Sequence, residues 1–138
     1  MGNIKRVFSY EEISEAVNQR YPFGDINPTD WLKEPHNIAL KNDKGDVSLF
    51  QYSQDKVFIG HYFFFSRGRE AITAAEEFLE ELFTKYHVEV IQGWTPLLNR
   101  KARWMSKRLG FKSYGVIHAA EACELFIMTK QEWKQKYG

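Results

Sequence analysis

The centre of the chain reads as a strand, a long helix and a second strand, and this order constrains the fold more than any other feature. Residues 57–65 are apolar and aromatic, apolar residues from Ile72 to Tyr86 recur with a helical period, and residues 88–94 are apolar again. A helix that connects two strands of one sheet lets those strands run parallel. We therefore predict that residues 88–92 lie parallel to residues 57–65.

The first of these strands enters the helix through a basic turn that contains a glycine. The sequence there is Phe63-Phe64-Phe65-Ser66-Arg67-Gly68-Arg69-Glu70-Ala71. A helix start carries about half a positive charge, so each arginine beside it costs roughly 0.3–1 kcal/mol unless an anion binds there. A second helix start repeats the pattern, with the sequence Asn99-Arg100-Lys101-Ala102-Arg103. Two cation-rich helix starts predict a site for a polyphosphate.

The segments around this unit read as antiparallel strands and short helices. Before it, strands over residues 38–41 and 47–53 are expected, joined by a turn at residues 42–45. After it, a helix that Asn99 caps is expected to end at Gly110, with a closing strand pair over residues 112–117 and 125–129. This order predicts an α/β fold in which a central mixed sheet is flanked by helices.

Each end of the chain carries a capping-box pattern, in which a hydroxyl residue is followed three positions later by glutamate. Ser9 and Glu12 predict a helix that follows a short strand over residues 4–8 and ends near Tyr21, where Pro22 follows. Thr129 and Glu132 predict a terminal helix anchored by Trp133 and Tyr137. We expect residues 1–138 to form a single domain.

Charge and cysteine content exclude several classes of function. The net charge is +1, so no overall field draws the molecule to nucleic acid or an anionic membrane. The single cysteine, Cys123, rules out a disulfide within the chain, and the histidines show no metal-ligand spacing, so no metal site is predicted. No apolar run approaches the ~20 residues that span a bilayer. We expect a soluble protein of the cytoplasm.

Residues 92–115 carry the sharpest family resemblance. Asn99-x-x-Ala102, followed by Leu109-Gly110-Phe111-Lys112 and Gly115, resembles the second half of the GNAT (Gcn5-related N-acetyltransferase) pattern, and by element order the resemblance covers about residues 38–129. Together with Arg67–Ala71 and Gly93-x-Thr95-Pro96, the same motif is similar to GNAT-like proteins encoded by tailed bacteriophages, some of which are labelled head-assembly proteins. That origin would place the protein in the host cytoplasm.

The resemblance implies that acetyl-CoA binds as cosubstrate in a cleft between the two parallel strands. By this comparison, the backbone of Phe63, Phe64 and Phe65 pairs with pantetheine, and the turn made of Arg67, Gly68, Arg69, Glu70 and Ala71 holds the pyrophosphate. Asn99 would contact the cofactor, and an early cation of its helix, Arg103, would serve the 3′-phosphate. The turn is shorter than the usual family loop, so the arginine side chains are expected to contribute more than its amides.

The resemblance also implies acetyl transfer to an unidentified amine, which needs a base and an acid. His61, on the strand before the turn, is the candidate base. The family's usual acid is a tyrosine seven positions after the motif asparagine. Here that position is Ser106, a poorer acid than a phenol, and Tyr114 is the candidate substitute.

Two other classes of function stay open at this point. The serine at the acid position and the short turn favour a non-catalytic GNAT-like protein with a structural role, for example in phage assembly with a phage or host protein partner. The basic run over residues 100–112, which includes Trp104, favours a nucleic-acid-binding module. The near-neutral net charge makes nucleic acid the weaker of the two.

Overall fold

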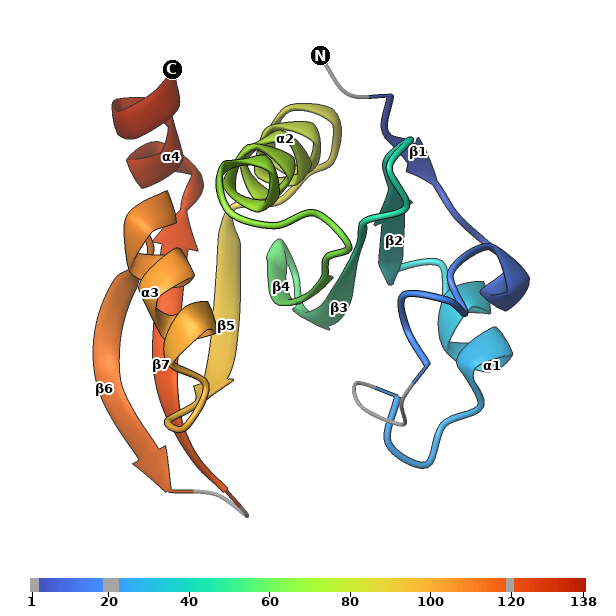
Figure 1. Ribbon diagram of the computed structural model, residues 1–138, viewed down its shortest axis with the longest axis horizontal. Helices are drawn as coiled ribbons and strands as arrows, with labels where there is room; N and C mark the ends of the chain where they lie inside the picture. The colour runs from blue at the N-terminus through green and yellow to red at the C-terminus, as the bar shows by residue number, and fades with distance from the viewer. Residues whose placement is uncertain (1–2, 19–22, 119–120) are drawn as a thin grey trace.

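The computed structural model describes residues 3–18, 23–118 and 121–138, and these form a seven-stranded mixed sheet with helices on its faces (Figure 1). The strands are β1 (Lys5–Arg6), β2 (Ile38–Lys41), β3 (Val47–Gln54), β4 (Val57–Phe63), β5 (Val90–Pro96), β6 (Lys112–His118) and β7 (Ala122–Thr129). The helices are η1 (Tyr10–Glu12), α1 (Pro28–Lys33), α2 (Arg69–Lys85), α3 (Arg100–Leu109) and α4 (Lys130–Tyr137). The predicted fold class is confirmed.

The strand order is β1-β2-β3-β4-β5-β7-β6, and the β4–β5 pair is parallel, as predicted. The two strands pair at only three positions, from Val57 opposite Val90 to Ile59 opposite Gln92. Both strands then continue without pairing with each other, β4 along β3 and β5 along β7. We call the point where they part, between Gly60 of β4 and Gly93 of β5, the fork.

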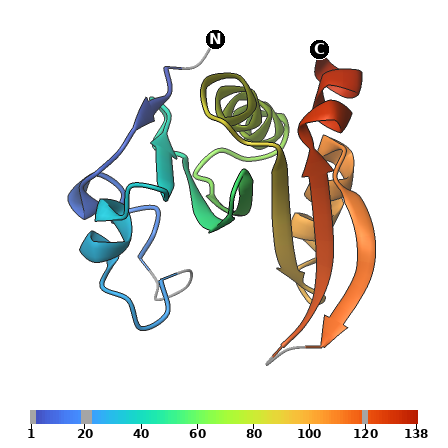
Figure 2. The ribbon, with the colours of Figure 1, turned by 180° about the vertical axis from the view of Figure 1, so that it is seen from behind.

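Two apolar cores lie on opposite faces of the sheet. Helices α2, α3 and α4 cover one face, which is turned to the viewer in Figure 1 and lies behind β5, β7 and β6 in Figure 2. The stripe predicted for α2 is buried there, and fully burying each of its large side chains contributes about 1.5–3 kcal/mol. The second core lies under η1 and α1. Strand β4 alternates between the two, because Phe58 packs in the first core and Phe63 against the second.

The predicted helix after Ser9 is wrong, because only the short 3-10 helix η1 forms there. The Ser9 hydroxyl bonds the carboxylate of Glu11 instead of capping a helix amide. The Glu12 carboxylate is held by Lys5, with Nζ and Oε1 2.9 Å apart. Both halves of the capping box are thus diverted to other partners. The predicted helix end at Tyr21 and Pro22 lies outside the described residues.

The other predicted helix boundaries hold. The capping box of Thr129 and Glu132 is complete, and Gly110 ends α3 in the left-handed conformation with a φ of 108°. Strand β4 stops at Phe63, two residues earlier than predicted. In the described ranges, no helix combines the length and apolar character needed to cross a membrane.

Candidate functional site

The fork opens a gap in the pairing of the sheet at the only parallel strand pair in the described part of the chain. Past Ile59 and Gln92, the edges of β4 and β5 that face each other have no ladder partner among the described residues. A glycine follows the last pair on each strand, so no side chain of Gly60 or Gly93 covers the junction. An open strand edge offers backbone donors and acceptors to an extended ligand.

A buried carboxylate fixes the chain where it leaves β4. Asp46, at the turn between β2 and β3, is fully buried. One of its oxygens accepts bonds from the amides of Phe65 (2.7 Å) and Ser66 (2.9 Å). The other accepts from the Ser66 hydroxyl (2.6 Å) and from Asn42 Nδ2 (3.0 Å). The turn that leads into α2 is therefore held at a defined place beside the sheet.

The charge state of Asp46 follows from these bonds. Burial alone raises the pKa of its carboxyl, but the bonds from Ser66, Asn42 and Phe65 outweigh it and lower the pKa below the ordinary value. Asp46 is thus ionised at neutral pH. The sequence analysis did not identify this residue. The available signal was an acidic side chain directly before the buried start of a strand, at Val47, where a charge needs partners.

The start of α2 has the features of an anion site. Gly68 occupies the N-cap with a φ of 58° and ψ of −130°, a conformation that favours glycine, and no side chain caps the helix. Arg67 and Arg69 are exposed, and neither forms an ion pair within the described chain. Glu70 lies 3.4 Å from Lys44 on the β2–β3 turn, while Ala71 is buried. Uncapped amides and two guanidinium groups converge on this turn.

The start of α3 looks similar in sequence but is bonded differently. Asn99 caps the helix, its Oδ1 accepting from the Ala102 amide at 3.1 Å. Arg103 turns toward the sheet, where Nε donates to Glu124 at 2.7 Å and Nη1 to the Leu97 carbonyl at 3.1 Å. Bonds from the Ser113 hydroxyl and from Arg103 lower the pKa of Glu124. Arg103 therefore joins α3 to β7. In this it differs from the exposed members of the basic run.

His61 lies on β4 just past the fork, on the face opposite α2. Its side chain is 8% exposed, and Nε2 lies 3.4 Å from Gln51 Oε1. Burial lowers the pKa of the imidazole to about 4, so His61 is neutral at physiological pH and able to accept a proton. Direct transfer from a protonated alkylamine would be uphill by about 9 kcal/mol, since such an amine has a pKa near 10.4.

The two candidate acids are not brought together with His61. Ser106 is half-buried on α3, which covers the opposite face of the sheet from His61. Tyr114 is exposed on β6, and β7 lies between β6 and β5. With strands about 4.8 Å apart, the backbone of Tyr114 is then about 14 Å from β4.

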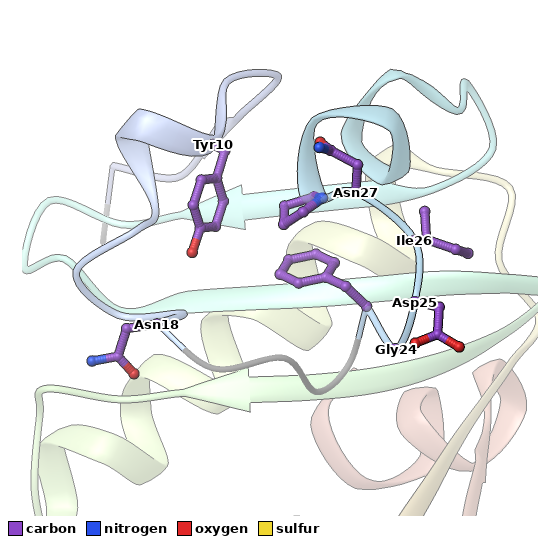
Figure 3. Close-up of a pocket in the computed structure, with 8 residues that line it drawn as sticks. Tyr10, Asn18, Gly24, Asp25, Ile26 and Asn27 are labelled. Carbon is purple, nitrogen blue, oxygen red and sulfur yellow. The ribbon is translucent and has the colours of Figure 1, made fainter.

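A cavity of about 410 Å³ lies beside η1 and the start of α1, away from the fork (Figure 3). Tyr10, Asn18, Asp25 and Asn27 supply its polar groups. A second hollow, of about 260 Å³, lies between the β2–β3 turn and the first turns of α2. Only this second one adjoins the turn that Asp46 holds. Within the described ranges, no cluster of three or more metal-ligating side chains occurs.

Comparison with known proteins places the fold. No family model matches the chain, and no curated protein matches it at a significant level. Solved structures do match. A spermidine/spermine N-acetyltransferase from Vibrio cholerae superposes with a TM-score of 0.78 at 10% identity, with all of both chains covered. A putative acetyltransferase from Acinetobacter baylyi gives 0.66 at 12% identity, covering 94% of this chain and 93% of the other.

A putative acetyltransferase from T. thermophilus gives a TM-score of 0.61 at 17% identity, over 77% of this chain and 65% of that one. These identities are low, so the likeness concerns the arrangement of the backbone. A GCN5-related N-acetyltransferase from Brucella melitensis matches over a shorter part, 71% of this chain. The chain therefore has the fold of the GCN5-related N-acetyltransferases.

Proposed function

We propose that the protein binds acetyl-CoA at the fork and transfers the acetyl group to an amine. The observation that carries this proposal is the continuity of the open β4 edge with the turn that Asp46 holds and with the uncapped start of α2. An extended pantetheine arm suits the strand edge, and a pyrophosphate suits the helix start. The acetyltransferases with the same fold support the reaction type.

The described residues fit this ligand with one adjustment. The arm would run along β4 past the fork, beside Phe63 and Phe64, and the pyrophosphate would lie on the turn from Arg67 to Ala71. The Phe65 amide already donates to Asp46, which leaves only the Phe65 carbonyl for the arm. Asn99 keeps its Nδ2 donors for the ligand, because its Oδ1 caps α3.

The 3′-phosphate would approach the first turn of α3, where Arg103 is the proposed ligand. Its guanidinium carries five N–H donors. Nε donates to Glu124 and Nη1 donates to the Leu97 carbonyl. A partly engaged arginine can still contact a phosphate at its outer edge. The neighbouring Arg100 and Lys101 are exposed there and add positive charge.

Bound acetyl-CoA supplies an acetyl thioester, whose C–S bond breaks as a C–N bond forms to the amine. The amine loses a proton overall, and His61 is the group placed to accept it. Because the pKa of His61 is about 4, we infer that the amine reaches the site in its neutral form. Ser106 is the nearest counterpart of the family acid and Tyr114 its alternative, for the proton that the thiolate requires.

A second candidate is a GNAT-like protein that has lost turnover and acts as a structural component. Two observations favour it: the serine at position 106 and the distance in strand order from Tyr114 to the fork. The narrower resemblance to proteins of tailed bacteriophages, which rests on the two helix-start motifs, would make that role one in phage assembly. For either version we propose a cytoplasmic location, which would be the host cytoplasm for a phage protein.

Thermal unfolding with and without acetyl-CoA tests the binding step. A ligand at 100 times its Kd stabilises the folded state by about 2.7 kcal/mol, which raises the melting temperature by several degrees. Release of free thiol with a panel of amines and peptides then tests turnover, with His61→Gln as the matched variant. Binding without thiol release would favour the structural candidate, and no shift at millimolar acetyl-CoA would remove the proposal of an acetyltransferase.

A further inference from the structure

The hydroxyl of Tyr62 is a buried polar group that the described protein leaves without a hydrogen-bond partner. The residue as a whole is half-buried, so part of the ring reaches the surface while the oxygen does not. Native proteins satisfy nearly all buried polar atoms, and each exception calls for an explanation. A ligand that supplies the missing partner is one such explanation.

The position of this hydroxyl is next to the fork. The Tyr62 ring folds back along its own strand, and its oxygen lies only 2.8 Å from where a Cβ on residue 60 would be. Gly60 is the first residue of β4 beyond the last pair with β5. Any side chain at position 60 would displace the hydroxyl, so the glycine keeps that place available.

Neighbouring rings hold Tyr62 in this orientation. Phe64 stacks on it with centroids 6.1 Å apart and an interplanar angle of 10°. Phe50 contacts it edge-on at 5.8 Å. The hydroxyl is therefore carried on a fixed ring, at the face of the sheet that α2 covers. A donor fixed in advance loses little conformational entropy when it meets a ligand.

A second unpartnered hydroxyl shows why the location matters. Ser48 lies directly opposite Tyr62 in the β3–β4 ladder, and its buried hydroxyl also lacks a partner in the described chain. Ser48, however, lies on β3 and has a ladder partner on each side, Leu40 of β2 and Tyr62 of β4. Only the Tyr62 hydroxyl lies beside a strand edge that a ligand can reach.

We propose that the Tyr62 hydroxyl donates a hydrogen bond to the acyl-pantetheine arm of acetyl-CoA at the fork. This inference rests on the proposed function and adds a ligand-binding residue to it. The arm is rich in suitable acceptors, since its amide carbonyls and the thioester oxygen can each accept from a phenol. Tyr62 thus recognises the arm, while the start of α2 recognises the phosphates.

The chemistry of the phenol limits its role to that of a donor. Burial raises the pKa of the Tyr62 hydroxyl above its ordinary value. A departing thiolate, with a thiol pKa near 8.5, is too weak a base to remove that proton. Tyr62 therefore keeps its proton and holds the arm by a hydrogen bond, without replacing Ser106 or Tyr114 as a proton source.

Three variants, measured by calorimetry and by thermal unfolding, test this assignment. Tyr62→Phe removes the hydroxyl at the fork, Ser48→Ala removes the unpartnered hydroxyl away from it, and Tyr10→Phe removes a satisfied one that donates to the Val17 carbonyl at 2.8 Å. Two probes separate the halves of the ligand. These are acetyl-CoA, and adenosine 3′,5′-bisphosphate, which lacks the arm.

Tyr62→Phe is expected to melt at the wild-type temperature or above, and to bind acetyl-CoA about tenfold more weakly, the effect of one lost hydrogen bond. Its affinity for the bisphosphate stays at the wild-type value. Ser48→Ala keeps both affinities and does not melt lower. Tyr10→Phe melts lower, because it loses a made bond, and keeps both affinities.

An unchanged acetyl-CoA affinity in Tyr62→Phe overturns the assignment and leaves the proposed function standing. An equal loss for acetyl-CoA and the bisphosphate overturns it too, because the effect would then lie outside the arm. Failure of the wild-type protein to bind acetyl-CoA is a different result. It overturns the proposed function, and the role of Tyr62 falls with it.

Discussion

Helices α2 and α3 both begin among cations, yet the structure uses these cations in different ways. At α2, a glycine without a side-chain cap lies between Arg67 and Arg69, and neither arginine has an ion-pair partner in the described chain. At α3, Asn99 caps the helix and Arg103 is bonded to Glu124. The first start is open to a ligand, and the second is largely satisfied by the protein.

This difference shows that cations at a helix start do not by themselves identify an anion site. What separates the two is the strand that each helix meets. Strand β7 presents Glu124, with a side chain only 8% exposed, to the first turns of α3. The acidic residue near α2, Asp46, instead binds the amides of the preceding turn and forms no ion pair with Arg67 or Arg69 in the described chain.

The largest effect is expected when the carboxylate that holds the α2 turn is removed. Asp46→Ala leaves two backbone amides and two side-chain donors without their acceptor, at a cost of about 3–5 kcal/mol in the free energy of unfolding. Urea unfolding measures this loss. Asp43→Ala, an exposed change in the same turn, is the control and should stay within ~0.5 kcal/mol of wild type. A similar small effect for Asp46→Ala would mean that other contacts hold the turn.

A pH titration of stability separates His61 from the two carboxylates. The folded pKa of His61 is about 4 against an ordinary 6.5, so the unfolded chain binds more protons between these values. The contribution is therefore complete above pH 6.5, and falls by up to about 3 kcal/mol as the pH drops to 4. The lowered pKa values of Asp46 and Glu124 add a further loss of stability below about pH 5, where their unfolded carboxyls begin to take up protons.

Unfolding curves of wild type and His61→Gln between pH 4.5 and 7.5 check this expectation. The variant lacks the buried imidazole, so its stability should fall less over the same range. Parallel curves would show that His61 titrates normally in the folded protein. The pKa of His61 would then lie above about 4, and His61 would be a stronger base than its burial implies.

Breaking the bonds at α3 should cost less than breaking those at α2. Glu124→Gln keeps the shape but removes the charge that Arg103 and Ser113 bind, so we expect a loss of about 2 kcal/mol in unfolding free energy. If Arg103 also contacts the 3′-phosphate, Glu124→Gln should weaken acetyl-CoA binding less than Arg103→Ala does. Dephospho-acetyl-CoA provides the control, because Arg103→Ala should leave its affinity unchanged. Equal losses for both ligands would confine Arg103 to a structural role.

The smallest change in stability, with a clear change in binding, is expected at the open helix start. Arg67→Ala and Arg69→Ala should each weaken acetyl-CoA binding about tenfold, the effect of one charge-assisted bond to phosphate. Unfolding should stay within ~0.5 kcal/mol of wild type, because neither side chain packs in a core. Arg108→Ala, an exposed arginine in the last turn of α3, is the matched control. If it weakened binding as much as Arg67→Ala, the contrast between the two helices would disappear.

The sequence predicted those parts of the fold that depend on local periodicity. The apolar stripe of α2, the parallel pairing of its flanking strands and the cap at Thr129 follow from spacing alone. The same capping pattern failed at Ser9, because Lys5 and Glu11 compete for its two side chains. The capping pattern does not show whether other side chains, here those of Lys5 and Glu11, bind its two members instead.

The candidate site divides in the same way. Strand alternation places His61 and Tyr62 on opposite faces of β4, which is a consequence of their adjacent positions in the sequence. The bonds of Asp46 and of Arg103 span 20 and 21 residues, and no motif marks them. Nothing in the sequence distinguishes Tyr62 from the neighbouring aromatic residues, because its role depends on the bonds that its hydroxyl does not make. The roles of the predicted site residues stay predictions.

Calorimetric titration of the wild-type protein with acetyl-CoA tests the central claim most directly. We expect saturable binding at one site per chain, weakened by salt because phosphates contact Arg67 and Arg69, and strongly reduced when both are changed to alanine. Absence of binding at millimolar acetyl-CoA would contradict it. Binding that persists unchanged in the double variant would also contradict it, since the ligand would then lie somewhere other than the start of α2.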